Sequence, residues 1–172
     1  SARWDADYDF RGKRVAVIGT GASAIQLVPE LVKQAEQVKV FQRTPAWVLP
    51  RADFATPESQ KRLFHRLPLA QQVMREALFY GHEVMATALI WRSPLSSVVE
   101  SVARAHLHRQ VPDRWLRRQL TPDYRIGCKR VLISNDWYPA LQQPNAKLVT
   151  WPIVQLREEG IQTAEGAVHA VD

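Results

Sequence analysis

Apolar and polar residues at the start of the chain follow two different periods. Lys13 to Gly19 is a nearly continuous apolar run rich in β-branched residues, which is typical of a buried strand. From Ala22 to Gln34 the apolar residues recur at helical spacing, which predicts a helix that Pro29 is expected to kink or split. Gln37 to Gln42 predicts a second short strand. This order predicts a βαβ unit, whose parallel strands are joined by a right-handed crossover.

A long helical region follows, and strand patterns then return. Prolines at positions 57, 68, 94 and 112 each stand where a first helical turn would begin, so we expect a helical insertion over residues 55–121. Within it, Ala77 to Trp91 predicts a core helix, because this apolar window is shorter than the ~20 residues that a membrane span needs. Ala146 to Thr150 predicts another strand, while Ile153 to Arg157 and Gly160 to Thr163 predict a β-hairpin. The expected fold class is α/β: a Rossmann-like domain with a parallel sheet, a helical insertion and a β-hairpin near the C-terminus.

Composition and charge narrow the function classes. The chain has 172 residues, 46% of them hydrophobic, which is ordinary for a globular domain. Its single cysteine, Cys128, excludes an internal disulfide, and its first residues lack the apolar run of a signal peptide, so we expect a cytoplasmic protein. The formal net charge of +6 fits nucleic-acid binding, or a basic surface with a pocket for an anionic cofactor; we favour the latter because the basic residues are scattered. His106 and His108 lie on different helix faces, so no metal site is expected.

The turn after the first strand has the pattern of a dinucleotide site. Residues 19–24 read Gly-Thr-Gly-Ala-Ser-Ala, which fits the motif G-x-G-x-x-A. Gly19 permits the tight turn, Gly21 lets the backbone approach a pyrophosphate, and Ala24 is small enough for close strand–helix packing. The helix that begins there offers unpaired N–H groups to the phosphates. A strand before and a helix after supply the context that the motif requires.

The residues after the second strand distinguish between the two nicotinamide dinucleotides. A site for NAD or FAD usually places Asp or Glu there, to bind the ribose hydroxyls. This chain has Arg43 and Thr44 instead, and Glu36 stands before the strand rather than after it. A guanidinium and a hydroxyl suit the dianionic 2′-phosphate of NADP. We therefore expect NADP(H).

Three segments of the chain carry a resemblance to a known family. They read VAVIGTGASAIQ (15–26), VFQRTPAWVLPR (40–51) and YRIGCKR (124–130). Together they resemble the NADPH-binding domain of class B flavoprotein monooxygenases, with the Baeyer–Villiger monooxygenases as the closest branch. The resemblance implies that residues 1–172 are an NADPH-binding domain excised from a larger FAD-containing enzyme. In keeping with this, Ser1 to Trp4 and Val168 to Asp172 are similar to the ends at which the family's domain joins the rest of its chain.

The resemblance also implies roles for individual residues. Arg43 and Thr44 match the clamp for the 2′-phosphate, and Lys129 matches a second cation near that phosphate. Arg130 matches the arginine that, in the family, faces the flavin and stabilises the negatively charged peroxyflavin, so it is expected to be catalytic. The residues expected at the pyrophosphate turn are Gly19, Thr20, Gly21, Ala22, Ser23, Ala24, Ile25 and Gln26.

The reaction that the resemblance implies belongs to a larger parent enzyme. That enzyme would reduce FAD with NADPH and insert oxygen from O2 into a ketone, or oxidise a heteroatom. This chain would bind NADP(H), and its partners would be the FAD domain of the same parent chain, which holds FAD, and a small-molecule ketone or heteroatom substrate. By itself the chain is expected to be inactive. We expect it to bind no nucleic acid and to have no membrane-spanning segment.

Three alternatives make different demands on the sequence. The NADPH domain of another two-dinucleotide flavoprotein oxidoreductase is one alternative; within that class, a disulfide reductase would need a cysteine pair that one cysteine cannot supply. A short-chain dehydrogenase needs Tyr-x-x-x-Lys, and Lys129 stands one step too far from Tyr124. A basic helical module for nucleic acid would bind with a steep dependence on salt.

Overall fold

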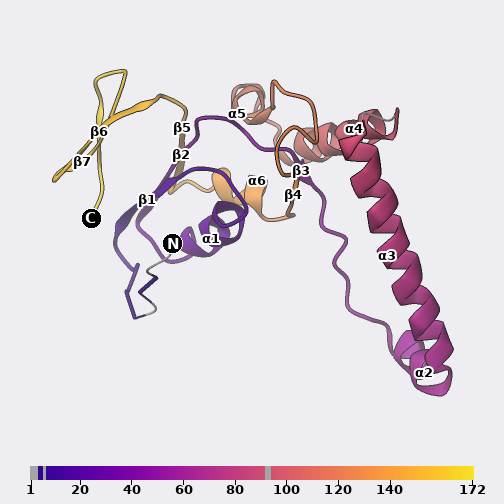
Figure 1. The fold of residues 1–172 in the computed structure, drawn as a ribbon. Helices are drawn as coiled ribbons and strands as arrows, with labels where there is room; N and C mark the ends of the chain where they lie inside the picture. The colour runs from indigo at the N-terminus through magenta and orange to yellow at the C-terminus, as the bar shows by residue number, and fades with distance from the viewer. Residues whose placement is uncertain (1–3, 6, 92–93) are drawn as a thin grey trace.

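The computed structural model describes residues 4–5, 7–91 and 94–172. Most of the segment Ser1 to Trp4, which is similar to one end of the family's domain, therefore lies outside the described residues. Its centre is a three-stranded parallel sheet in the order β1-β2-β5 (Figure 1). The strands are β1 (Arg14–Ile18), β2 (Gln37–Phe41) and β5 (Ala146–Val149). Helix α1 (Ala24–Leu31) connects β1 to β2, and this confirms the expected βαβ unit.

Alternating apolar residues explain why these strands form the centre of the fold. Val15 pairs with Val38 and Val17 with Val40, and Val38 and Val40 are completely buried. Valines two residues apart point to the same face of a strand, so these four line the face of the sheet that packs in the main core. Short helix α6 (Trp137–Leu141) packs against α1 in the same core.

Helix α1 is shorter than the sequence indicated. We expected a helix from Ala22 to Gln34, whereas α1 runs from Ala24 to Leu31. Pro29 lies inside the helix and is buried, and the helix ends soon after it. A proline has no N–H to donate to the preceding turn, yet α1 continues past Pro29 to Leu31, so the proline does not split the helix.

Helices α2 (Glu58–Arg66), α3 (Pro68–Ile90), α4 (Pro94–Gln110) and α5 (Arg114–Leu120) occupy the expected helical region. Prolines begin α3 and α4, where their fixed φ suits the first turn. Asp113 caps α5, because its carboxylate accepts hydrogen bonds from the backbone N–H groups of Trp115 at 3.2 Å and Leu116 at 2.9 Å. Leu107 of α4, Leu120 of α5 and Val111 between the two helices pack in the hydrophobic core beside the sheet.

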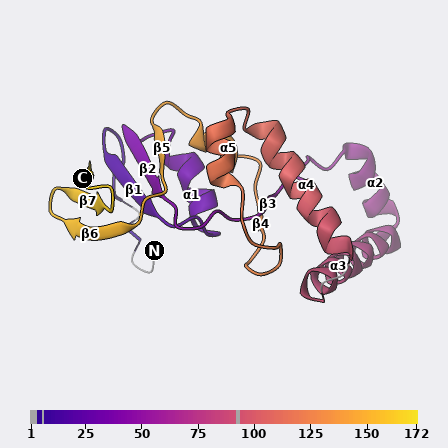
Figure 2. The ribbon, with the colours of Figure 1, turned by 90° about the horizontal axis from the view of Figure 1, so that it is seen from above.

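The expectation of a core helix at Ala77 to Trp91 was wrong. This segment belongs to α3, which extends away from the sheet as an arm with α2 at its far end (Figures 1 and 2). Leu78, Phe79, Val84 and Met85 are all exposed. The apolar pattern was read correctly as a helix, but among the described elements α3 packs mainly against α2 and α4 and not against the sheet.

Two smaller sheets complete the fold. The expected hairpin is confirmed as β6 (Ile153–Arg157) and β7 (Gly160–Thr163), and β8 (Val168–Ala170) adds a third antiparallel strand. A two-residue parallel pair, β3 (Val48–Leu49) with β4 (Leu132–Ile133), was not expected. Because β4 pairs with β3, the segment before β4, which includes Lys129, lies near the end of β2.

Candidate cofactor site

The glycine turn connects the ends of the first two strands. Gly19 has a φ of 101°, a left-handed conformation that favours glycine. Its backbone N–H donates to the carbonyl of Phe41 at 2.9 Å. The hydroxyl of Thr20, which is 9% exposed, donates to the carbonyl of Thr44 at 3.0 Å. These bonds hold the turn after β1 against the segment that follows β2.

The backbone amides beyond the turn are free to bind a ligand. Those of Gly21, Ala22, Ser23 and Ala24 donate to no acceptor within the described part of the chain. The Ser23 side chain makes no capping bond to α1, so it does not compete for them. Free amides at a helix start, together with the helix dipole, form an anion-binding site.

The residues expected at this turn contribute in different ways. Gly21 and Ser23 are exposed, whereas Ala24 and Ile25 are buried in the core and can offer a ligand only their backbone. The Gln26 side chain turns back, and its amide donates to the carbonyl of Ala22 at 2.8 Å. Gln26 therefore steadies the turn in this structure.

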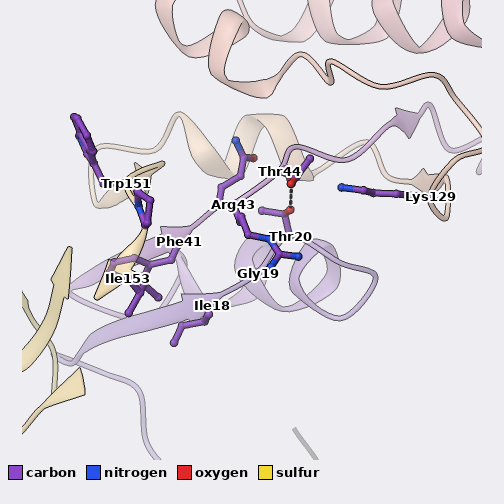
Figure 3. Close-up of a pocket in the computed structure, with 11 residues that line it drawn as sticks. Ile18, Gly19, Thr20, Phe41, Arg43, Thr44, Lys129, Trp151 and Ile153 are labelled. Atoms are coloured by element: carbon purple, nitrogen blue, oxygen red, sulfur yellow. Dashed lines mark hydrogen bonds between the residues drawn. The ribbon is translucent and has the colours of Figure 1, made fainter. Parts of the chain in front are cut away.

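Two cations meet at a cavity of about 570 Å³ beside the turn (Figure 3). Arg43 and Thr44 directly follow β2, and Lys129 reaches the same cavity from the segment before β4. The volume is within the ~300–1,000 Å³ of small-molecule sites. The remaining lining residues are Ile18, Gly19, Thr20, Phe41, Gln42, Trp151, Pro152 and Ile153.

The position of Lys129 follows from the packing around β3 and β4. The N–H of Leu132 donates to the carbonyl of Trp47 at 2.9 Å, which aligns the two strands. The Trp47 indole N–H donates to the carbonyl of Tyr124 at 2.8 Å, and the Tyr124 hydroxyl donates to the carbonyl of Pro45 at 3.0 Å. The ammonium of Lys129 lies 4.6 Å from the centre of the Tyr124 ring, a cation–π contact.

Arg130 lines a second cavity, of about 280 Å³, which adjoins the first. The two cavities share Thr20, Thr44 and Lys129 in their linings, so they adjoin each other beside the glycine turn, and we call the pair of cavities the groove. The structure thus brings Arg130 to the same groove as the other expected cofactor residues. Cys128, which lies two residues before Arg130, is exposed and lines neither cavity.

The groove is strongly cationic. No Asp or Glu is among the described residues that line either cavity. In the part of the chain that the structure describes, no ion pair neutralises Arg43, Lys129 or Arg130. Burial raises the pKa of the Tyr124 phenol, so this ring stays neutral beside Lys129 at physiological pH. Unpaired cations and free amides together favour an anion of more than one phosphate.

Sequence reasoning missed the apolar wall of the larger cavity. Ile18 and Phe41 end β1 and β2, and Trp151, Pro152 and Ile153 follow β5. The signal was available, because ligands of parallel sheets bind at the carboxyl ends of the strands.

Among the described residues there is no cluster of potential metal ligands and no helix long and apolar enough to cross a membrane.

Known proteins match this chain along its whole length. A Baeyer–Villiger monooxygenase of Pseudomonas aeruginosa is 44% identical over 172 residues, all of this chain and 33% of that protein. One of Streptomyces coelicolor is 42% identical over the same extent. The chain corresponds to a portion of a Baeyer–Villiger-type class B flavin monooxygenase. It spans about a third of the length of these relatives.

A family model and solved structures agree with this relationship. The model for flavin-binding monooxygenase-like proteins matches residues 1–70. A structure described as oxidized steroid monooxygenase bound to NADP superimposes with a TM-score of 0.77 at 28% identity, over 99% of this chain and 40% of that one. An open crystal structure of cyclohexanone monooxygenase gives the same TM-score at 22% identity, with 99% and 40% coverage, and supports the fold alone.

Proposed function

We propose that this chain is the NADPH-binding domain of an FAD-dependent monooxygenase. The observation that carries the proposal is the groove of two adjoining cavities, which brings the free amides of Gly21 and Ala22 together with the unpaired cations Arg43 and Lys129. A dinucleotide phosphate presents a diphosphate and a separate phosphate monoester, which match these two sets of groups. The structure of a related monooxygenase with NADP bound supports the choice of ligand.

The side chains around Arg43 favour NADP over NAD. Arg43 is exposed at the end of β2, where a 2′-phosphate of the adenosine ribose would lie, and no carboxylate of the described residues lines the cavity to bind a free 2′-hydroxyl. Thr44 lines the same cavity, and its carbonyl accepts a hydrogen bond from the Thr20 hydroxyl. Lys129, which stands shortly before β4 of the β3–β4 pair, adds a second positive charge to the cavity.

In the parent enzyme, NADPH would supply a hydride and FAD would carry the oxygen chemistry that converts a ketone to an ester, or oxidises a heteroatom. In this proposal, the residues of this chain position the cofactor and neutralise its charge. The amides of Gly21 to Ala24 hold the diphosphate, and Arg130 places a permanent positive charge at the second, smaller cavity. We assign FAD to the remainder of the same protein. We also place the protein in the cytoplasm, where a single exposed thiol such as Cys128 stays reduced.

Calorimetric titration of the chain with NADP⁺ and NAD⁺ tests the proposal. We expect NADP⁺ to bind at least about ten times more tightly, since the extra phosphate gains charge-assisted hydrogen bonds of ~1.5–3 kcal/mol. Equal affinities would refute the 2′-phosphate assignment. Tight binding of DNA that weakens steeply with salt, without binding of NADP⁺, would favour a nucleic-acid module instead.

A further inference from the structure

The apolar end of the larger cavity has a composition that the phosphate-binding groups do not explain. Trp151, Pro152 and Ile153 form one side of it, with Ile18 and Phe41 at the strand ends. In Figure 3, Trp151 and Lys129 lie at opposite ends of the drawn group, with Arg43 between them. The cavity therefore grades from a cationic end to an apolar, aromatic end.

Trp151 differs from the structural tryptophans of the chain. Trp47 and Trp137 are each 2% exposed, whereas Trp151 is 53% exposed. Among the described residues, Trp151 stacks on no other aromatic ring. An indole left half-open on the wall of a cavity is suited to a flat, partly polar ligand.

The backbone around Trp151 is held in place, so the indole is presented by a firm support. On one side, the N–H of Gln42 donates to the carbonyl of Val149 at 2.8 Å. On the other side, the N–H of Ala164 donates to the carbonyl of Pro152 at 2.9 Å. Proline at 152 also restricts the backbone of Trp151 itself to extended conformations. Such preorganisation lowers the entropy cost of binding.

The covalent structure of a 2′-phosphorylated nucleotide connects the two ends of the cavity. The base is attached to C1′ of the ribose, next to the C2′ that carries the phosphate. If Arg43 holds the 2′-phosphate and the glycine turn holds the diphosphate on the 5′ side, the base is directed away from the turn. The part of the cavity that remains is the apolar end beside Trp151.

We infer that Trp151 is the adenine platform of the cofactor site, with Pro152 and Ile153 completing its apolar wall. This inference rests on the proposed function, and it names the residue that recognises the base rather than the phosphates. Base–aromatic stacking contributes ~1–3 kcal/mol by alanine substitution, which corresponds to about 5- to 100-fold in affinity. Because NAD and NADP share the adenine, Trp151 contributes equally to both, in contrast to Arg43.

The test is calorimetry on the chain with NADP⁺, NAD⁺ and adenosine 2′,5′-bisphosphate, for wild type, Trp151→Ala and Trp151→Phe. We expect Trp151→Ala to weaken all three ligands by the same factor, about 5- to 100-fold, and to leave the NADP⁺/NAD⁺ ratio unchanged. Trp151→Phe keeps an aromatic face and should lose less than Trp151→Ala. Trp91→Ala, which removes a 78% exposed tryptophan that lines neither cavity, should bind as wild type does.

The possible failures are distinguishable. If Trp151→Ala binds adenosine 2′,5′-bisphosphate as tightly as wild type does, the adenine platform is wrong, while the NADP proposal stands on the wild-type affinities. If wild type binds neither NADP⁺ nor the bisphosphate, the proposed function fails and the platform fails with it. Folding is not at issue, because the Trp151 side chain is half-exposed and outside the hydrophobic core clusters.

Discussion

Replacing Arg43 by alanine should convert a site selective for NADP into one that no longer distinguishes it from NAD. Arg43 is exposed at the cavity, and no acidic side chain among the described residues pairs with it. Its guanidinium is therefore free to meet a 2′-phosphate with two parallel hydrogen bonds. The substitution removes this contact without leaving an unpaired carboxylate behind.

The magnitude follows from the exposure of the pair. Two unit charges at 4 Å interact by ~1 kcal/mol in water and ~4 kcal/mol at a protein surface, and hydrogen bonds to charged groups contribute ~1.5–3 kcal/mol. We expect Arg43→Ala to weaken NADP⁺ by about 10- to 100-fold and NAD⁺ by less than about two-fold. Lys129→Ala should cost NADP⁺ less, because an ammonium forms no fork and Lys129 is partly engaged by the Tyr124 ring.

The assay is isothermal calorimetry at low and high salt, with Arg62→Ala on the exposed helix α2 as the matched control. The NADP⁺ preference of wild type should shrink as ionic strength rises, because the pair is only partly shielded from solvent. Arg62→Ala should retain wild-type affinities. Equal losses of NADP⁺ and NAD⁺ in Arg43→Ala, or no loss at all, would refute the reasoning.

Three further predictions concern the turn, the small antiparallel sheet and the second, smaller cavity. Gly19→Ala should destabilise the chain by ~1–2 kcal/mol and weaken the binding of NADP⁺, because φ at this glycine is 101°. As a control, Gly12→Ala, at a φ of 69° with open space around it, should lower the melting temperature and leave the affinity for NADP⁺ unchanged. Burial, reinforced by the charges of Lys39 and Lys147, lowers the pKa of His169, so the folded state binds fewer protons than the unfolded state. The free energy of unfolding should therefore fall as the pH drops below about 6.5. Urea melts from pH 8 to pH 5 should show a smaller dependence of this free energy on pH in His169→Gln, and an unchanged dependence would contradict the prediction. In the full-length enzyme, Arg130→Ala should leave flavin reduction by NADPH largely intact while oxygenated product is lost, as stopped-flow absorbance and product analysis would show; normal product yield would exclude the role assigned to Arg130.

The βαβ unit was predictable because each of its signals is local. The apolar run of β1, Gly19 and the helical spacing of α1 lie within one stretch of sequence, and local propensity and tertiary packing agree there. The position of Arg43 followed for the same reason, since it directly succeeds β2. The end of α1 at Leu31 was missed because apolar residues continue at helical spacing beyond it, as at Val32 and Ala35.

The rest of the site depends on contacts between distant residues. Lys129 and Arg130 reach the groove through the β3–β4 pair, whose strands are two residues long and carry no periodic signal. Trp151 joins the site because β5 ends beside β2, which the sequence alone does not fix. The exposure of α3 was missed because an apolar pattern predicts a face to be covered, and says nothing about which chain segment covers it.

A crystal structure of this chain with NADP⁺ bound is the measurement that decides the central claim. The prediction is a diphosphate against the backbone amides of Gly21 to Ala24, and a 2′-phosphate about 3 Å from the Arg43 guanidinium. Adenine would then lie beside Trp151, with the nicotinamide half directed along the groove towards Arg130. A dinucleotide bound elsewhere, or one whose 2′-phosphate faces solvent away from Arg43, would contradict it.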